Sequence, residues 1–192
     1  MSVSTADQET QSRLEHFPIT LFAIGMGMMG LTLALRAAET MFDLRHNGSG
    51  AVLVLSVGIL AVVSAGYIAK LIRHPKEVVA DWNHPVKIAF FPAISISVLL
   101  LATALLSYAP KASLVLWLFG TAAQGIVALS VISAWIGHRA FQPAMITPAW
   151  FIPAVGNVIV PLAGAPLGYV EISWLFFSGG LVFWVILLTL VV

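Results

Sequence analysis

The five histidines are the residues of this sequence best suited to bind a metal or a haem, and all lie at the ends of long uncharged segments or in the connections between them. They are His16, His46, His74, His84 and His138. A two-haem cytochrome needs paired histidines deep in facing helices, and a membrane metalloprotease needs His-Glu-x-x-His on a helix. Neither pattern is present, so we interpret the histidines as interfacial polar residues and expect no metal and no cofactor.

The residues of nucleophilic catalysis are also missing from the sequence. There is no cysteine, which excludes thiolate nucleophiles, thiolate metal ligands and disulfides. No Gly-x-Ser-x-Gly motif occurs, and we interpret Asn47-Gly48-Ser49-Gly50 as a turn. We therefore predict no catalytic residue and do not expect an enzyme. A membrane-embedded enzyme or cytochrome subunit stays open as an alternative, which a haem spectrum or a bound metal would support.

Two helical faces carry residues that could line a path for a solute. One consists of Trp150, Pro153, Asn157, Pro161 and Gly164, and the other of Thr20, Ala23, Gly27, Gly30 and Ala34. Either face could be a packing seam, because small residues and asparagine favour helix contacts in membranes, or the wall of a conduction path. The pore-lining residues that we predict are Gly27, Gly30, Phe91, Ser95, Pro153 and Asn157.

Six long stretches without Asp, Glu, Lys or Arg would position these residues. The chain is 60% hydrophobic and 9% charged, whereas soluble domains carry about 25% charged residues. A stretch of about 20 apolar residues spans a bilayer as a helix, and the stretches are too long and too uniformly apolar for the alternating strands of a β-barrel. We predict an all-α polytopic membrane protein of three helical hairpins, with helices at about 17–38, 51–72, 87–108, 112–136, 146–164 and 172–192.

The charges suggest an orientation for this transmembrane domain, 16–192. Basic residues in short loops favour the cytoplasm, and the connection between the second and third spans holds four of them, Lys70, Arg73, Lys76 and Lys87. We therefore expect the polar tail 1–15 to be cytoplasmic. The net charge of +1 and the dispersed basic residues indicate no nucleic-acid partner. The last segment ends without a polar anchor, so we expect the N-terminal part of a longer protein.

The middle of each span is free of charge, and prolines are unevenly distributed. Ion-coupled transporters usually keep charged residues inside their spans, so their absence favours a passive pathway that binds ions weakly. Intramembrane prolines occur in the first, third and fifth spans, with Pro153 and Pro161 placed deepest. A proline kink frees a carbonyl that must be satisfied by protein or water. We therefore expect the odd-numbered helices inside and the even-numbered helices facing lipid.

Three motifs resemble the tellurite-resistance and dicarboxylate transporter family, which is related to the slow anion channels of plants. They are His16-Phe17-Pro18-Ile19 with the Gly25–Gly30 cluster, Asn83-His84-Pro85-Val86-Lys87 running into Phe90-Phe91-Pro92, and Ile146-Thr147-Pro148-Ala149-Trp150-Phe151-Ile152-Pro153-Ala154-Val155-Gly156-Asn157. The third is the most specific, and the similarity to the bacterial TehA-like branch covers the chain after its tail.

The resemblance implies a ten-helix fold with odd helices around a pore, assembled as a homotrimer in the plasma (inner) membrane. It implies transport of small anions, such as chloride, nitrate, dicarboxylates or tellurite oxyanions. Six spans cannot close such a ring, so we expect this chain alone not to conduct. Two alternatives remain: a coupled dicarboxylate or tellurite-oxyanion transporter on the same scaffold, and a small membrane scaffold protein, complete at six spans, that transports nothing.

Overall fold

The computed structural model describes residues 14–44, 47–137 and 147–191, and within them all regular elements are helices. The prediction of an all-α protein is confirmed. The helices in chain order are η1 (Ile19–Leu21), α2 (Phe22–Met41), α3 (Asn47–Arg73), α4 (Pro75–Asn83), η2 (Lys87–Phe90), α5 (Pro92–Leu105), α6 (Pro110–Gly137), η4 (Pro148–Trp150), α7 (Phe151–Ile159), α8 (Pro161–Gly164) and α9 (Val170–Val191), where η marks a 3₁₀ turn.

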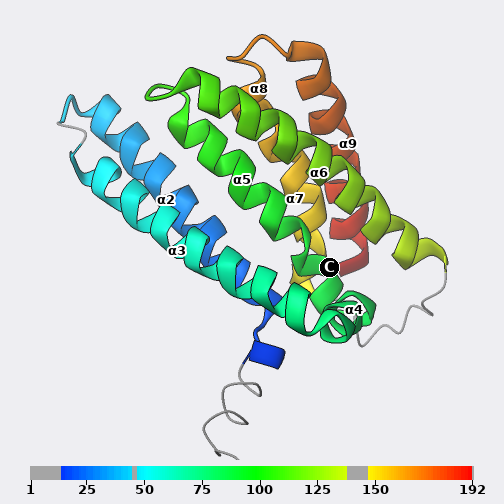
Figure 1. Ribbon diagram of the computed structural model, residues 1–192. Coiled ribbons are helices and arrows are strands. Elements are labelled where there is room, and N and C mark those ends of the chain that lie inside the picture. Colours follow the sequence, from blue (N-terminus) through cyan, green and yellow to red (C-terminus); the bar gives the residue numbers. More distant parts are fainter. Residues whose placement is uncertain (1–13, 45–46, 138–146, 192) are drawn as a thin grey trace, which may run out of the picture.

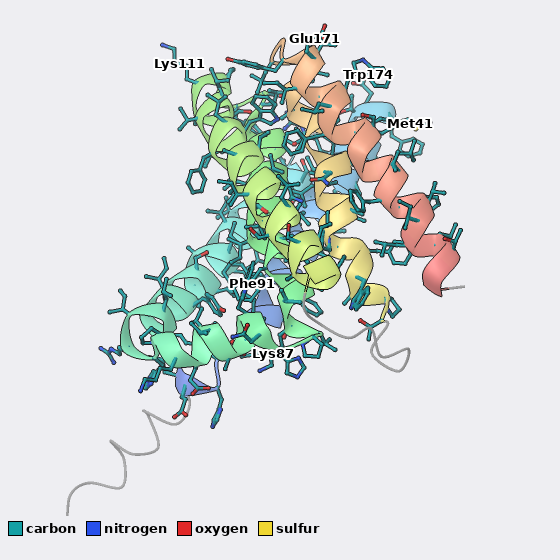
Figure 2. All side chains as sticks on the ribbon, turned by 90° about the vertical axis from the view of Figure 1, so that its right-hand side faces the viewer. Met41, Lys87, Phe91, Lys111, Glu171 and Trp174 are labelled. Carbon is teal, nitrogen blue, oxygen red and sulfur yellow. The ribbon has the colours of Figure 1, made fainter. Side chains whose placement is uncertain are left out.

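Five helical stretches of the described residues are long and apolar enough to cross a membrane: Ile19–Met41, Asn47–Arg73, Lys87–Leu105, Pro110–Trp135 and Val170–Thr189. The charged residues lie toward the ends of the bundle, with Lys111 and Glu171 at one end and Lys87 at the other (Figure 2). The chain is thus a multi-pass membrane protein. The expected fifth span is a shorter apolar stretch, Pro148–Gly164, and residue 146 of that prediction lies outside the described residues.

Helix α5 occupies the centre of the molecule, packed between α2 and α7 (Figure 1). Three antiparallel pairs build the bundle, because α2 packs on α3, α5 on α6, and α7 on α9. The α5 stretch is by far the most enclosed of the five spans. On α3 and α9 large apolar side chains such as Val54, Val62 and Leu175 are exposed, which suits contact with lipid tails.

The prolines of the third and fifth spans lie in the first turns of helices. For Pro153 and Pro161 this differs from the deep kinks expected from the sequence. Pro92, Pro148 and Pro161 are the first residues of α5, η4 and α8, and Pro153 is the third residue of α7. In a first turn the backbone N–H has no partner within the helix, so proline loses nothing there. Pro161 therefore divides the fifth apolar stretch into α7 and α8, and the amide of Val160 bonds instead to the carbonyl of Asn157 at 3.4 Å.

One further helix interrupts the connection between the second and third spans, which the sequence analysis treated as a loop. Helix α4 is amphipathic: Val78 and Trp82 are partly buried and Asp81 is buried, whereas Lys76 is exposed. It leads directly into η2. The three 3₁₀ turns η1, η2 and η4 each precede one of α2, α5 and α7, and η2 contacts both of the others. The N-terminal ends of α2, α5 and α7 thus lie together at one end of the bundle.

Candidate functional site

A glutamine near the middle of α6 joins this helix to α5 and α7. Gln124 is fully buried, and its Oε1 accepts a hydrogen bond from the Ser95 hydroxyl of α5 at 2.7 Å. Its Nε2 donates to the carbonyl of Pro153 at 3.1 Å and to Oδ1 of Asn157 at 3.2 Å, both on α7. Both amide hydrogens and the amide oxygen are therefore used. A buried amide without partners would be costly, so this network fixes the rotation of α6 relative to α5 and α7.

Close packing surrounds the amide. A Cβ added at Gly156 would overlap the Gln124 side chain, and one added at Gly180 would lie 2.9 Å from the Cβ of Asn157. Two turns before Gln124 on α6, the indole N–H of Trp117 donates to the carbonyl of Val160 at 2.9 Å. This bond is a second one to the Val160 carbonyl, which lies beside the break between α7 and α8 and also accepts from the backbone N–H of Gly164 at 3.1 Å. The polar and small face of the fifth apolar stretch is accordingly in contact with α6 and α9.

Three of the predicted pore-lining residues, Ser95, Pro153 and Asn157, are thus brought together by Gln124. Ser95 and Pro153 are buried, and Asn157 is partly buried beside a mainly apolar groove between α6 and α9. Gly27 and Gly30 are placed elsewhere. Both are exposed on α2, and a Cβ at either would meet no atom within 4 Å. Among the described residues, nothing packs against this face of α2.

Phe91, the sixth predicted residue, lies at the entry end of α5 (Figure 2). Its ring makes edge contacts with Trp82 of α4, at a centroid distance of 4.8 Å, and with Tyr67 of α3, at 6.4 Å. Tyr67 in turn contacts Phe22 of α2 at 5.7 Å. Phe91 therefore belongs to an aromatic row that links four helices at the end where the 3₁₀ turns meet.

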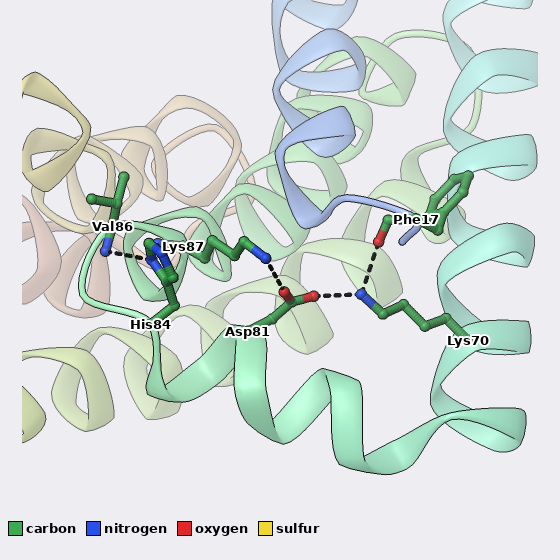
Figure 3. A network of polar contacts seen from close by, with 6 residues as sticks. All are labelled: Phe17, Lys70, Asp81, His84, Val86 and Lys87. Carbon is green, nitrogen blue, oxygen red and sulfur yellow. Dashed lines mark hydrogen bonds and ion pairs between the residues drawn. The ribbon is translucent and has the colours of Figure 1, made fainter. Parts of the chain in front are cut away.

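The same end holds an ion-pair cluster of Asp81, Lys70 and Lys87 (Figure 3). Nζ of Lys70 lies 2.6 Å from one carboxylate oxygen of Asp81, and Nζ of Lys87 lies 2.7 Å from the other. Lys70 also donates to the carbonyl of Phe17 at 3.0 Å. Burial raises the pKa of Asp81, but hydrogen bonds and charge from the two lysines outweigh it, so the pKa lies below the usual carboxyl value.

At the opposite end of the bundle, charged residues of α2 form hydrogen bonds with α5 and α3. Nη1 of Arg36, near the end of α2, donates to the carbonyl of Ala104 on α5 at 2.9 Å, and its guanidinium lies 4.7 Å from the centre of the Tyr108 ring. The carboxylate of Glu39 accepts a hydrogen bond from the backbone N–H of Ser49 at the start of α3, at 3.0 Å. Charged side chains thus make contacts between helices at both ends of the bundle, and the middles of the candidate spans between these ends are uncharged.

Sequence reasoning missed Gln124, although a signal was present: it is the one side-chain amide in the uncharged stretch 112–138. An amide at that depth needs partners, so its helix could not face lipid on all sides. The Asp81 cluster was also missed, since Lys70 and Lys87 were considered only as markers of orientation. Within the described residues there is no group of three or more His, Cys, Asp or Glu that could hold a metal.

Comparison with known proteins identifies the family. Residues 16–192 match the SLAC1 family, described as voltage-dependent anion channel. The chain belongs to this family. The resemblance inferred from the sequence is confirmed, and a family of channels and transporters is not a family of enzymes.

Three similar proteins show how much of the chain is shared. A tellurite resistance protein TehA homolog of Haemophilus influenzae is 29% identical over 88% of this chain and 52% of its own length. The S-type anion channel SLAH2 of Arabidopsis thaliana is 28% identical over 94% of this chain and 36% of its own. An uncharacterized transporter of Methanocaldococcus jannaschii is 23% identical over 81% of this chain and 46% of its own. The chain spans about half the length of these relatives or less.

Proposed function

We propose that this chain contributes part of a pathway for small anions across a membrane, acting as a channel that needs no coupled ion. The match of residues 16–192 to the anion channel family carries this proposal. The middles of the five candidate spans support it, because they hold no charged side chain that could bind an anion tightly or relay protons. Chloride, nitrate, dicarboxylates and tellurite oxyanions are the candidate solutes.

The lining of the pathway is proposed to begin with the small-residue face of α2. Gly27 and Gly30 leave this face open, and exposed backbone dipoles there can attract an ion without trapping it. Phe91 would stand at the entry of α5. Ser95, Pro153 and Asn157 would act through Gln124, which holds α5 and α7 at a fixed separation. In this proposal α2, α5 and α7 are inner helices, and α3, α6 and α9 are outer helices.

The proposed assembly is completed by further helices, because the chain spans about half of its relatives. We propose six crossings here, with Pro148–Gly164 as the fifth, a homotrimeric assembly, and an N-terminus in the cytoplasm beneath the plasma (inner) membrane. The Asp81 cluster would then face the cytoplasm. This orientation follows the excess of Lys and Arg in the connection between the second and third spans.

The test is the anion current through the assembled protein in a planar lipid bilayer. A chloride or nitrate current that persists without any proton gradient is expected, and Gly27→Val should reduce it by narrowing the path. Gly58→Val is the matched control, because Gly58 on α3 also has nothing within 4 Å of an added Cβ but belongs to a proposed outer helix. Equal effects of the two variants would contradict the proposed lining.

A coupled transporter is the second candidate, with dicarboxylates or tellurite oxyanions as its solutes; one relative is described as a tellurite resistance protein. The two candidates differ in their dependence on a gradient. Transport of a dicarboxylate or of tellurite that stops when the proton gradient is collapsed, with no current carried by chloride alone, would support the coupled transporter against the channel.

A further inference from the structure

The carboxylate of Asp81 is held as a small anion would be held in a binding site. Each of its oxygens pairs with a different ammonium group, Lys70 at 2.6 Å and Lys87 at 2.7 Å. The Asp81 side chain is only 4% exposed. Two short charge-assisted contacts to opposite oxygens are the arrangement that a protein uses to bind a free carboxylate or oxyanion.

The two cations come from separate elements and are built into the fold. Lys70 lies at the end of α3, with its side chain 3% exposed, and its ammonium is also anchored by the carbonyl of Phe17. Lys87 begins η2, and its side chain is 45% exposed. The site therefore has one buried cation, Lys70, and one cation that is partly exposed to water, Lys87. Figure 3 shows the carboxylate between the two ammonium groups, reached from the short helix α4.

The charges of the cluster do not cancel, since two lysines surround one carboxylate. A buried cation that loses its partner is strongly destabilising, so Lys70 needs an anion beside it. That anion is supplied by the chain itself, and among the described residues Lys87 leaves the cluster with one excess positive charge.

We propose that Lys70 and Lys87 form a binding site for a small monovalent oxyanion or carboxylate, which the chain's own Asp81 occupies at rest. A free anion from solution competes with Asp81 for the exposed ammonium group of Lys87. This inference goes beyond the proposed transport function and does not depend on it, because the site can be tested by binding alone.

The experiment is anion rescue of Asp81→Ala, followed as the thermal unfolding midpoint of the purified protein in detergent. Removing the carboxylate leaves a buried cation and a vacant space, and should lower the midpoint by about 6–20 °C. Sodium formate should restore most of this loss with a saturable dependence on concentration. Formamide, which is neutral and of similar shape, and sodium sulfate at equal ionic strength should not.

Two further variants make the result specific. Glu77→Ala removes another carboxylate of α4 and should show no formate effect, and Lys87→Gln combined with Asp81→Ala should lose the formate effect. If Asp81→Ala does not fold, Asp81→Ser is tested in the same series, since it also removes the carboxylate and leaves space for formate. The proposal is overturned if formate stabilises wild type and the Asp81 variant equally, or stabilises the variant no more than formamide does.

Discussion

The Gln124 network offers the sharpest test of how the centre of this bundle is held together. Gln124→Met keeps an unbranched side chain of similar length and removes the amide. The Ser95 hydroxyl keeps a partner, because it also lies 2.9 Å from the carbonyl of Pro92. The carbonyl of Pro153 and Oδ1 of Asn157 each lose the hydrogen bond from Gln124.

The magnitude follows from these two lost bonds. Hydrogen bonds between membrane helices contribute about 0.6 kcal/mol on average and up to about 1.7 kcal/mol. Loss of both should therefore reduce the free energy of unfolding by about 1–3 kcal/mol. The effects of Gln124→Met and Asn157→Leu should not add, with a coupling energy of about 0.5 kcal/mol or more, because both remove one shared contact.

The assay is the unfolding free energy in bicelles, measured by steric trapping or by titration with a denaturing detergent. Ser130→Ala is the matched control on the same helix, because among the described residues its hydroxyl bonds only to the Ile126 carbonyl one turn away. It should change the free energy of unfolding by less than about 0.5 kcal/mol. A Gln124→Met protein as stable as this control would refute the argument that the amide joins α5, α6 and α7.

Three further outcomes are expected. Gly156→Ala should destabilise by about 1–3 kcal/mol in the same assay, because its Cβ overlaps the α6 amide, whereas Gly27→Ala in open space should not. Trp117→Phe removes an indole N–H bond to a backbone carbonyl and should cost about 1 kcal/mol, whereas Trp174→Phe on an exposed side chain should cost less. Asp81 has a lowered pKa in the folded protein, so the stability it contributes is present at neutral pH. That contribution should disappear as the pH falls below about 4 and through the folded pKa, and denaturation curves of Asp81→Asn should lack this acid-dependent loss.

Some residues of the candidate site were predicted from the sequence, but the residue that joins them was not. Pro153 and Asn157 were selected from the least lipid-like face of the fifth span, and Ser95 because it lies one turn from Phe91; the structure brings these three together through Gln124. The residue that joins them, Gln124, was assigned to a helix expected to face lipid. The spans are apolar on nearly every side, so periodicity does not reveal how each is rotated about its axis, and rotation decides which polar groups meet.

The uneven distribution of the prolines pointed to the first, third and fifth spans, and the inner position expected for these spans stays a prediction. The prolines were expected to bend continuous helices, and instead they begin helices after a short 3₁₀ turn or divide a stretch in two. Helix α4 was missed because nine residues of mixed polarity carry little signal of their own. It is held by tertiary contacts, namely the Asp81 ion pairs and the contact of Trp82 with Phe91.

The sequence by itself determined that this chain is helical and crosses a membrane, because a long uncharged stretch in lipid can satisfy its backbone polar groups only within its own helix. It also determined the family, through motifs spread along the chain. Only the tertiary structure decided that Gln124 joins three helices, that Gly27 and Gly30 face open space, and that Asp81 lies between two lysines. These contacts join residues far apart in the chain, and they depend on the rotation and depth of packed helices, which local composition does not encode.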